Sequence, residues 1–214
     1  MTPKTFIPLL AGGVFVLALS LTPAVGAGTS AIAPTCSRQE QGDAMTASDL
    51  ALIRPYVSKF SGIAFCAPAA WSIEIEDESI FLAPSEAHQF WENAADADET
   101  YYSIGRVSPF LSPEDASAGR TRTALEIARS TANALMFTQH MKIVELKNVA
   151  FANSRDSASL LMGARQRFQY QVIIYLESGR IVTVSVNGRR EDQRRSLALV
   201  DAIARTIRPL SDDG

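Results

Sequence analysis

The stretch SLLMGARQRFQYQVIIYLESGRIVTVSV, residues 159–186, decides the fold of this chain. From residue 167 to residue 172 polar and apolar side chains alternate, and a strand presents alternate side chains to opposite faces. The apolar set is Phe168, Tyr170, Val172 and Ile174, and the polar set is Arg167, Gln169 and Gln171. Ser178-Gly179 then marks a hairpin turn before the next apolar run, residues 180–186. The stretch therefore predicts antiparallel strands with one face in the core.

Two amphipathic helices are predicted, one before this stretch and one after it. The apolar face of the first helix is Leu125, Ala128, Ala132 and Leu135, with polar residues on the opposite face. KIVEL, residues 142–146, reads as a strand that follows this helix. The second helix is expected over about 191–208 and ends at Pro209. Its apolar face is Leu197, Val200, Ala204 and Ile207.

The residues before the first helix read mostly as short strands. Strand patterns occur at residues 63–66, 71–76, 80–83 and 101–107. Residues 48–60 read instead as a short helix or turn, and residues 85–100 as a short helix followed by an acidic loop. Because consecutive strands joined by short turns pair antiparallel, this order predicts an α+β fold. The fold is an antiparallel β-sheet flanked by amphipathic helices, in a single domain.

The first residues have the layout of a secretory signal peptide. Lys4 precedes an uncharged, mostly apolar run, and Val25-Gly26-Ala27 offers small residues for cleavage after Ala27. The alternative is an uncleaved N-terminal membrane anchor, since residues 6–27 are long enough to span a bilayer. We therefore expect a signal peptide at 1–27, an N-terminal tail with a short helix at 28–59, and an α/β domain at 60–210.

The composition is that of an ordinary globular chain, with 47% hydrophobic and 20% charged residues. The charge is unevenly placed along the sequence. Residues 28–119 carry 4 Lys/Arg against 14 Asp/Glu, a balance of −10, and residues 120–214 carry 15 against 9, a balance of +6. Such asymmetry marks a basic binding face in some proteins, and in others the two halves complement each other within one fold.

Cys36 and Cys66 are the only two cysteines. In an exported chain, an even pair of cysteines most economically forms one disulfide bond. There is no C-x-x-C redox motif, and two cysteines with two distant histidines make a poor zinc site. A Cys36–Cys66 bridge would attach the polar N-terminal tail to the first strand of the domain.

GIAFCAPAAW, residues 62–71, resembles the G-x-x-(apolar)-x-x-P-x-x-W opening of PsbP-like and DcrB-like domains. The long helix, the strand meander with its glycine turn and the C-terminal helix follow in the order of that family, so the resemblance covers about 60–210. It implies an α/β/α sandwich around an antiparallel sheet. It implies a module that binds partners and that has no enzymatic activity. Cys66 is a departure from the family pattern.

Groups that carry chemistry are scarce in the sequence. The chain has no G-x-S-x-G elbow, no H-E-x-x-H, no Walker loop and no G-x-G-x-x-G, so we predict no catalytic residue, no metal site and no cofactor. His88 and His140 read as surface positions on or after helices. The acidic run Glu92, Asp96, Asp98 and Glu99 could gather calcium, but it lacks the glycine and the spacing of an EF-hand loop.

One basic cluster is a candidate binding patch. It consists of Arg189, Arg190, Arg194 and Arg195, at the start of the final helix. Guanidinium groups bind carboxylates and phosphates, so the patch would receive an envelope protein or an anionic envelope component. The alternative is an ordinary solvated surface. Export and an overall acidic balance argue against nucleic acid as the partner. No second segment is apolar enough to span a membrane once the signal is cleaved.

Together these features predict a periplasmic or secreted, non-catalytic binding or assembly module of the cell envelope. One alternative is a carrier of a small apolar or lipidic ligand held between sheet and helices. The other is a hydrolase with a site around His88 and the acidic loop.

Overall fold

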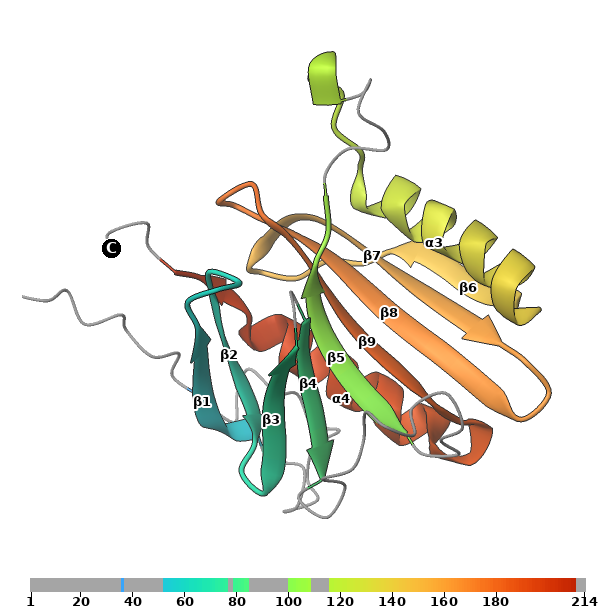
Figure 1. The fold of residues 1–214 in the computed structure, drawn as a ribbon, viewed down its shortest axis with the longest axis horizontal. Helices are drawn as coiled ribbons and strands as arrows, with labels where there is room; N and C mark the ends of the chain where they lie inside the picture. Colours follow the sequence, from blue (N-terminus) through green and yellow to red (C-terminus); the bar gives the residue numbers. More distant parts are fainter. Residues whose placement is uncertain (1–35, 37–51, 77–78, 85–99, 109–115, 211–214) are drawn as a thin grey trace, which may run out of the picture. The chain divides into compact units, whose positions relative to one another are not determined.

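The stretch 159–186 forms the middle of a seven-stranded antiparallel sheet (Figure 1). A computed structural model describes residue 36 and residues 52–76, 79–84, 100–108 and 116–210. In chain order the strands are β3 (Trp71–Glu76), β4 (Ser79–Pro84), β5 (Tyr101–Arg106), β6 (Lys142–Asn148), β7 (Ser154–Gly163), β8 (Arg167–Leu176) and β9 (Ile181–Arg189). In space their order is β3-β4-β5-β9-β8-β7-β6, so β5 lies beside β9, although most of the domain separates them in sequence.

The predicted hairpin joins β8 to β9. Gly179 has a φ of +83°, a conformation that costs glycine nothing, and its N–H donates to the Leu176 carbonyl oxygen at 2.9 Å. The register that follows places Val172 opposite Val184. Because directly opposite residues share a face, the apolar set of β8 meets valines of β9, as the alternation predicts.

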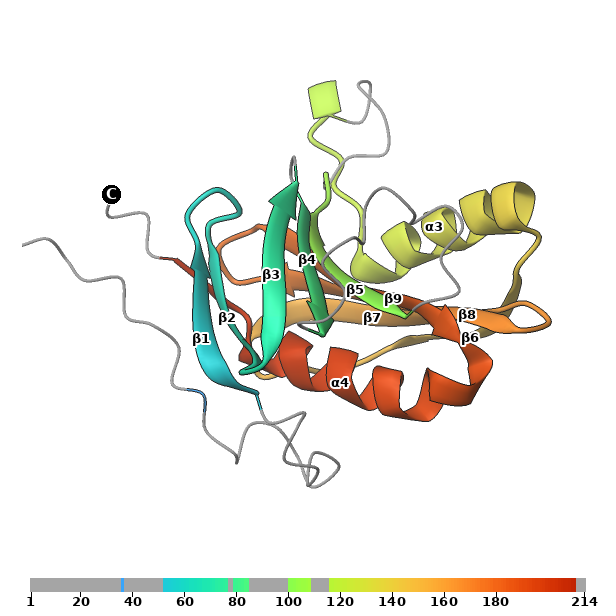
Figure 2. The ribbon, with the colours of Figure 1, turned by 60° about the horizontal axis from the view of Figure 1, so that its bottom comes forward.

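The two predicted helices cover opposite faces of the sheet (Figure 2). α3 (Ala124–Gln139) packs on β6, β7 and β8, and α4 (Gln193–Thr206) packs on β8 and β9 and also contacts a further strand, β2 (Ile63–Pro68). A capping box fixes the start of α3, where the Thr123 hydroxyl accepts the Glu126 N–H at 3.2 Å and the Glu126 carboxylate accepts the Thr123 N–H at 2.8 Å. The predicted α/β/α arrangement is confirmed.

A second, three-stranded sheet has the order β1-β2-β10. It is formed by β1 (Leu52–Ser58), β2 (Ile63–Pro68) and β10 (Arg208–Pro209). The short helix predicted within 28–59 is therefore wrong for residues 52–58, which pair with β2 from Leu52 opposite Pro68 to Ser58 opposite Ile63. Pro55 has no N–H to donate but is tolerated because β1 is an edge strand. The strand also extends the folded domain upstream of residue 60.

The disulfide bond predicted between Cys36 and Cys66 is confirmed. The two Cα atoms are 5.8 Å apart, and Cys66 is fully buried on β2. The Cys66 N–H donates to the Thr206 hydroxyl at the end of α4, at 2.9 Å. The bridge therefore attaches residue 36 to a strand that is itself bonded to α4.

Two apolar layers result, one on each face of the sheet. The α4-side core includes Phe65, Trp71, Tyr102, Phe168, Val184 and Ile203. The α3-side core is smaller and includes Ile127, Leu135, Leu160, Met162, Ile173 and Ile181. All of these residues belong to one unit, 31–214.

Several predictions concern residues outside the described ranges. The signal peptide at 1–27, most of the tail, the short helix at 85–100, His88 and the acidic run with its calcium alternative belong to this group. Among the described residues, no helix is long and apolar enough to cross a membrane.

Candidate functional site

A polar surface crosses three adjacent strands on the side of the sheet that faces α3. We call it the polar sheet face, and it consists of Tyr101 and Ser103 of β5, Ser185 and Asn187 of β9, and Gln169 and Gln171 of β8. All six side chains are half-buried. The residues that alternate with them, such as Tyr102, Val186 and Tyr170, lie in the α4-side core. Strand alternation therefore separates the polar set from the apolar set on all three strands.

The six residues form two rows across the strands. Gln169, Asn187 and Tyr101 are successive opposite partners, and so are Gln171, Ser185 and Ser103. Neighbouring strands lie about 4.8 Å apart, and residues two apart on one strand lie about 7 Å apart. The polar sheet face is therefore a regular grid of amide and hydroxyl groups.

Four of the six side chains bond to one another across β5 and β9. The Ser103 and Ser185 hydroxyl oxygens are 2.8 Å apart, and the Asn187 amide nitrogen donates to the Tyr101 hydroxyl at 2.8 Å. The two glutamines of β8 differ from them. The Oε1 atoms of Gln169 and Gln171 are buried and accept no hydrogen bond within the described structure. A buried acceptor without a partner costs about 1–3 kcal/mol, so a donor that reached these atoms would be bound favourably.

Two arginines continue this face at one end of the strands. Arg167 of β8 lies directly opposite Arg189 of β9. Each is an even number of residues from the polar residues on its own strand, so both lie on the same face of the sheet as the glutamines and Asn187. Arg189 is exposed and forms an ion pair with Glu191 at 3.7 Å between Nη1 and Oε1. Cationic groups therefore border the polar sheet face at the end of β8 and β9 that lies opposite the β8–β9 turn.

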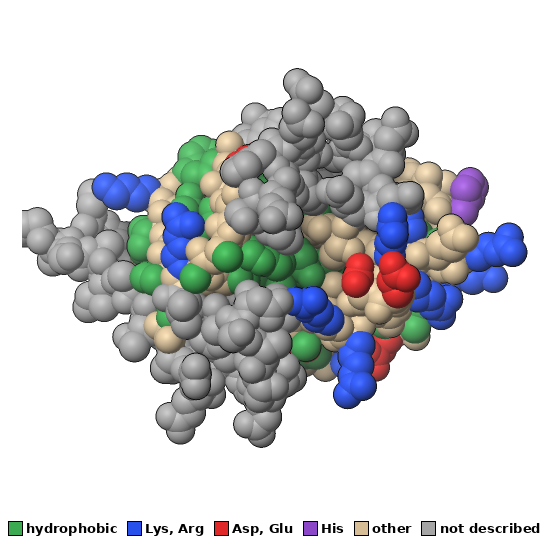
Figure 3. Space-filling model, turned by 90° about the horizontal axis from the view of Figure 1, so that it is seen from below, with side chains coloured by type: hydrophobic (Ala, Val, Ile, Leu, Met, Phe, Trp, Pro, Cys, Tyr) green, Lys and Arg blue, Asp and Glu red, His purple; other side chains and the backbone are tan. Residues whose placement is uncertain are grey.

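The four arginines of the predicted basic patch are all exposed, but the structure divides them. Arg189 ends β9 at the edge of the polar sheet face, Arg190 begins a 3₁₀ turn, and Arg194 and Arg195 lie in the first turn of α4, which packs on the opposite side of the sheet. Glu191 and Asp192 stand between them in sequence. Figure 3 shows one side of the molecule on which basic and acidic side chains are interspersed.

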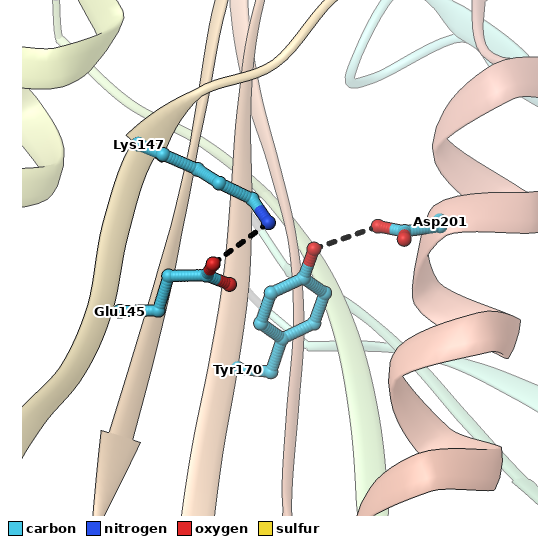
Figure 4. Close-up of polar contacts among 4 residues, drawn as sticks. All are labelled: Glu145, Lys147, Tyr170 and Asp201. Carbon is cyan, nitrogen blue, oxygen red and sulfur yellow. Dashed lines mark hydrogen bonds and ion pairs between the residues drawn. The ribbon is translucent and has the colours of Figure 1, made fainter.

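A second polar cluster joins β8 to α4 on the other side of the sheet (Figure 4). The Tyr170 hydroxyl donates to the Asp201 carboxylate at 2.8 Å, and beside them Lys147 and Glu145 of β6 form an ion pair at 2.9 Å. Burial raises the pKa of Tyr170, and the nearby Asp201 carboxylate raises it further. Burial also raises the pKa of Asp201, although the Tyr170 hydrogen bond and the charges of Arg205 and Lys147 oppose this. This cluster links elements across the core and has the character of a structural contact.

No group of three or more His, Cys, Asp or Glu side chains that could hold a metal occurs in the described residues. His140 follows α3 with a φ of 53°, in the left-handed region, and its side chain is exposed. It ends the helix there, as its sequence position predicts.

The sequence pattern identified only part of this site. The alternation of Arg167, Gln169 and Gln171 marked the polar side of β8, and Arg189 was identified as a candidate. Tyr101, Ser103, Ser185 and Asn187 were missed. Their i, i+2 spacing predicts that Tyr101 and Ser103 share one face of a strand, as do Ser185 and Asn187. Nothing in the local sequence indicates that β5 and β9 are neighbours.

No protein-family model and no curated protein sequence matches this chain. Solved structures do match it. Cyanobacterial PsbP (CyanoP) from Synechocystis sp. PCC 6803 is 10% identical, with a TM-score of 0.50 over 73% of this chain and 91% of that one. A mutant of the protein Mog1 is 12% identical, with a TM-score of 0.48 over 74% and 96% of the two chains. LpqN, involved in cell envelope biogenesis of Mycobacterium tuberculosis, is 12% identical, with a TM-score of 0.43 over 74% and 90%. The likeness to CyanoP confirms the PsbP-like fold expected from residues 62–71.

Proposed function

We propose that this chain is an exported, non-catalytic binding module of the cell envelope, and that it binds its partner on the polar sheet face. The partner is an anionic envelope component rich in N–H or O–H donors. One observation carries this proposal: two glutamine oxygens, side by side on β8, are buried without a hydrogen-bond donor among the described residues.

The disulfide bond supports export. Cys36 and Cys66 are bonded to each other, and structural disulfides form and persist in oxidising compartments such as the periplasm or the cell exterior. This observation agrees with the signal peptide expected at residues 1–27.

The chemistry of the polar sheet face supports binding without catalysis. Its six side chains are amides and hydroxyls, which recognise ligands through hydrogen bonds. The Oε1 atoms of Gln169 and Gln171 accept bonds only, so they select a ligand that donates. Arg167 and Arg189 at the end of the same face favour a ligand that also carries a carboxylate or a phosphate.

Site-specific photo-crosslinking in the cells that produce the chain tests this proposal. A photoreactive residue replaces Gln166, in the exposed turn next to the arginines, and in a matched variant it replaces Ser178, in the exposed turn at the other end of β8. We expect an adduct with an envelope component from position 166 and none from position 178. Equal adducts from both positions, or none from either, would contradict binding on the polar sheet face.

A second pair of measurements separates binding from export. Gln169→Leu together with Gln171→Leu removes both acceptors while keeping the strand, and the loss of two hydrogen bonds should lower the yield of adduct about fivefold or more. Alkylation of thiols before and after reduction reports the state of Cys36 and Cys66 in the same cells. Reduced cysteines in the producing cell would contradict export whatever the crosslinks show.

A further inference from the structure

We propose that β6 is a dimerisation strand, which pairs antiparallel with β6 of a second copy of this chain. β6 is the last strand of the seven-stranded sheet, and no described strand pairs with its outer edge. Six of its seven side chains are exposed. An exposed edge strand offers unpaired N–H and C=O groups to another strand. This inference is independent of the proposed function.

The backbone of β6 determines which residues can meet a partner strand. The Val149 N–H donates to the Ser157 carbonyl oxygen at 3.0 Å, in the register that also pairs Lys147 with Ser159. Hydrogen-bonded and non-hydrogen-bonded positions alternate along an antiparallel pair. The backbone groups of Glu145 and Lys147 therefore point toward β7. Those of Leu146 point away from β7, to the open edge.

Leu146 is consequently a suitable centre for a two-fold symmetric pair. Two copies related by such an axis place Leu146 opposite its own copy, with both N–H groups donating to the opposite carbonyl oxygens. In that register Glu145 of each chain lies opposite Lys147 of the other, twice by symmetry. These are non-hydrogen-bonded positions, where opposite side chains approach most closely.

The charges agree with the register that the backbone allows, because a shift by one residue in either direction would oppose like charges. A pair centred on Glu145 places two carboxylates opposite each other, and a pair centred on Lys147 places two ammonium groups opposite each other. Like charges directly opposite are unfavourable, and opposite charges are favourable. The charges of two β6 strands are therefore complementary when the antiparallel pair is centred on Leu146.

Apolar side chains beside this edge supply the remaining contact. Leu146 packs against the α3-side core, and Ile143, which lies opposite the core residue Met162, is 43% exposed on the same side. Met136 and Phe137, near the end of α3, are 43% and 84% exposed. Since α3 packs on β6 and ends just before it, the two-fold axis places the exposed end of each α3 beside the far end of the other chain's β6.

Charge reversal in the complete chain tests the register. Lys147→Glu or Glu145→Lys turns two attractive pairs into two repulsive ones, and we expect the dimer dissociation constant to rise about 30-fold in sedimentation velocity. The double variant E145K/K147E restores both pairs and should return to within about threefold of the unchanged chain. Lys142→Glu is the matched control, because it makes the same charge change on β6 opposite no charged residue.

Disulfide trapping tests the symmetry axis. Opposite residues at a hydrogen-bonded position have Cα atoms about 5.5 Å apart, which suits a disulfide bond. Both native cysteines are already bonded, so Leu146→Cys adds the single free thiol. We expect a covalent dimer on oxidation of Leu146→Cys and at most a trace with Asn148→Cys, which lies off the axis. A chain that stays monomeric to millimolar concentration overturns the proposal. So does a dimer whose dissociation constant is unchanged in both Lys147→Glu and Glu145→Lys, or one that E145K/K147E fails to restore.

Discussion

The two faces of the three central strands have opposite characters although they share one backbone. Toward α4, β5, β8 and β9 present a mostly apolar surface, and α4 covers β8 and β9. Toward α3 they are apolar only near the β8–β9 turn, where Ile173 and Ile181 lie in the α3-side core, and polar over the remainder. The α4 side therefore contributes buried apolar contacts to stability, whereas the polar part of the α3 side is the surface on which we propose that a partner binds.

Adjacent residues of β8 give the sharpest test of this contrast. Phe168→Ala opens a cavity in the α4-side core, where this side chain is 1% exposed, and should lower the free energy of unfolding by about 3–5 kcal/mol. Gln169→Leu, one residue away on the polar sheet face, removes a buried acceptor that has no partner. We expect it to leave the free energy of unfolding unchanged or to raise it by up to about 1 kcal/mol.

Urea denaturation of the two variants measures both values. The m-value should stay constant, because neither change alters how much surface unfolding exposes. Similar losses of stability at both positions would remove the distinction between the faces and with it the reason to regard the polar sheet face as functional.

The sequence predicted the fold well where local periodicity decides the structure. Residues 167–172 alternate between polar and apolar because one face of this antiparallel strand is buried and the other is not, and Gly179 marks the hairpin because its φ is positive. The segment 52–58 was predicted wrongly because its local pattern, interrupted by Pro55, is weak. Its strand conformation comes from pairing with β2, a tertiary contact that propensity does not contain.

The candidate site was less predictable for a related reason. Gln169 and Gln171 were assigned to the polar side of β8 from spacing alone. Their neighbours Tyr101 and Asn187 meet only because β5 pairs with β9 across most of the domain. A contact between residues so distant in sequence is a property of the topology, which no local pattern encodes.

Removal of the disulfide bond tests how far the α4 side depends on covalent support. Cys36→Ala together with Cys66→Ala should lower the free energy of unfolding by about 3–4 kcal/mol in the chain-entropy model, since the bridge closes a sequence separation of 30 residues. Thermal unfolding with and without reductant provides the measurement. The unchanged chain under reductant should approach the variant, whereas the variant should not respond to reductant at all.

The smallest expected effect is a dependence on pH that differs in sign between the two sides. Burial on the α4 side raises the pKa of Asp201, so its protonated form is favoured by folding. The stability that this group contributes is complete below the ordinary aspartate pKa of about 4 and is lost as pH rises through the raised folded value. Asp201→Asn removes this loss and keeps an oxygen that accepts the Tyr170 hydroxyl. The variant should therefore gain stability relative to the unchanged chain as pH increases.

Glu126, at the exposed start of α3, provides the opposite case. Hydrogen bonds from the Thr123 backbone N–H and hydroxyl lower the pKa of Glu126, so its stabilising contribution is present at neutral pH and is lost as pH falls through the lowered folded value. Glu126→Gln should therefore lose stability relative to the unchanged chain as pH increases, the reverse of Asp201→Asn. Equilibrium unfolding from pH 3 to pH 7 compares the two slopes. If the stability differences of the two variants changed with pH in the same direction, the Asp201 carboxylate would not be held in a desolvated site. The contrast between the two sides of the sheet would then not extend to their charged groups.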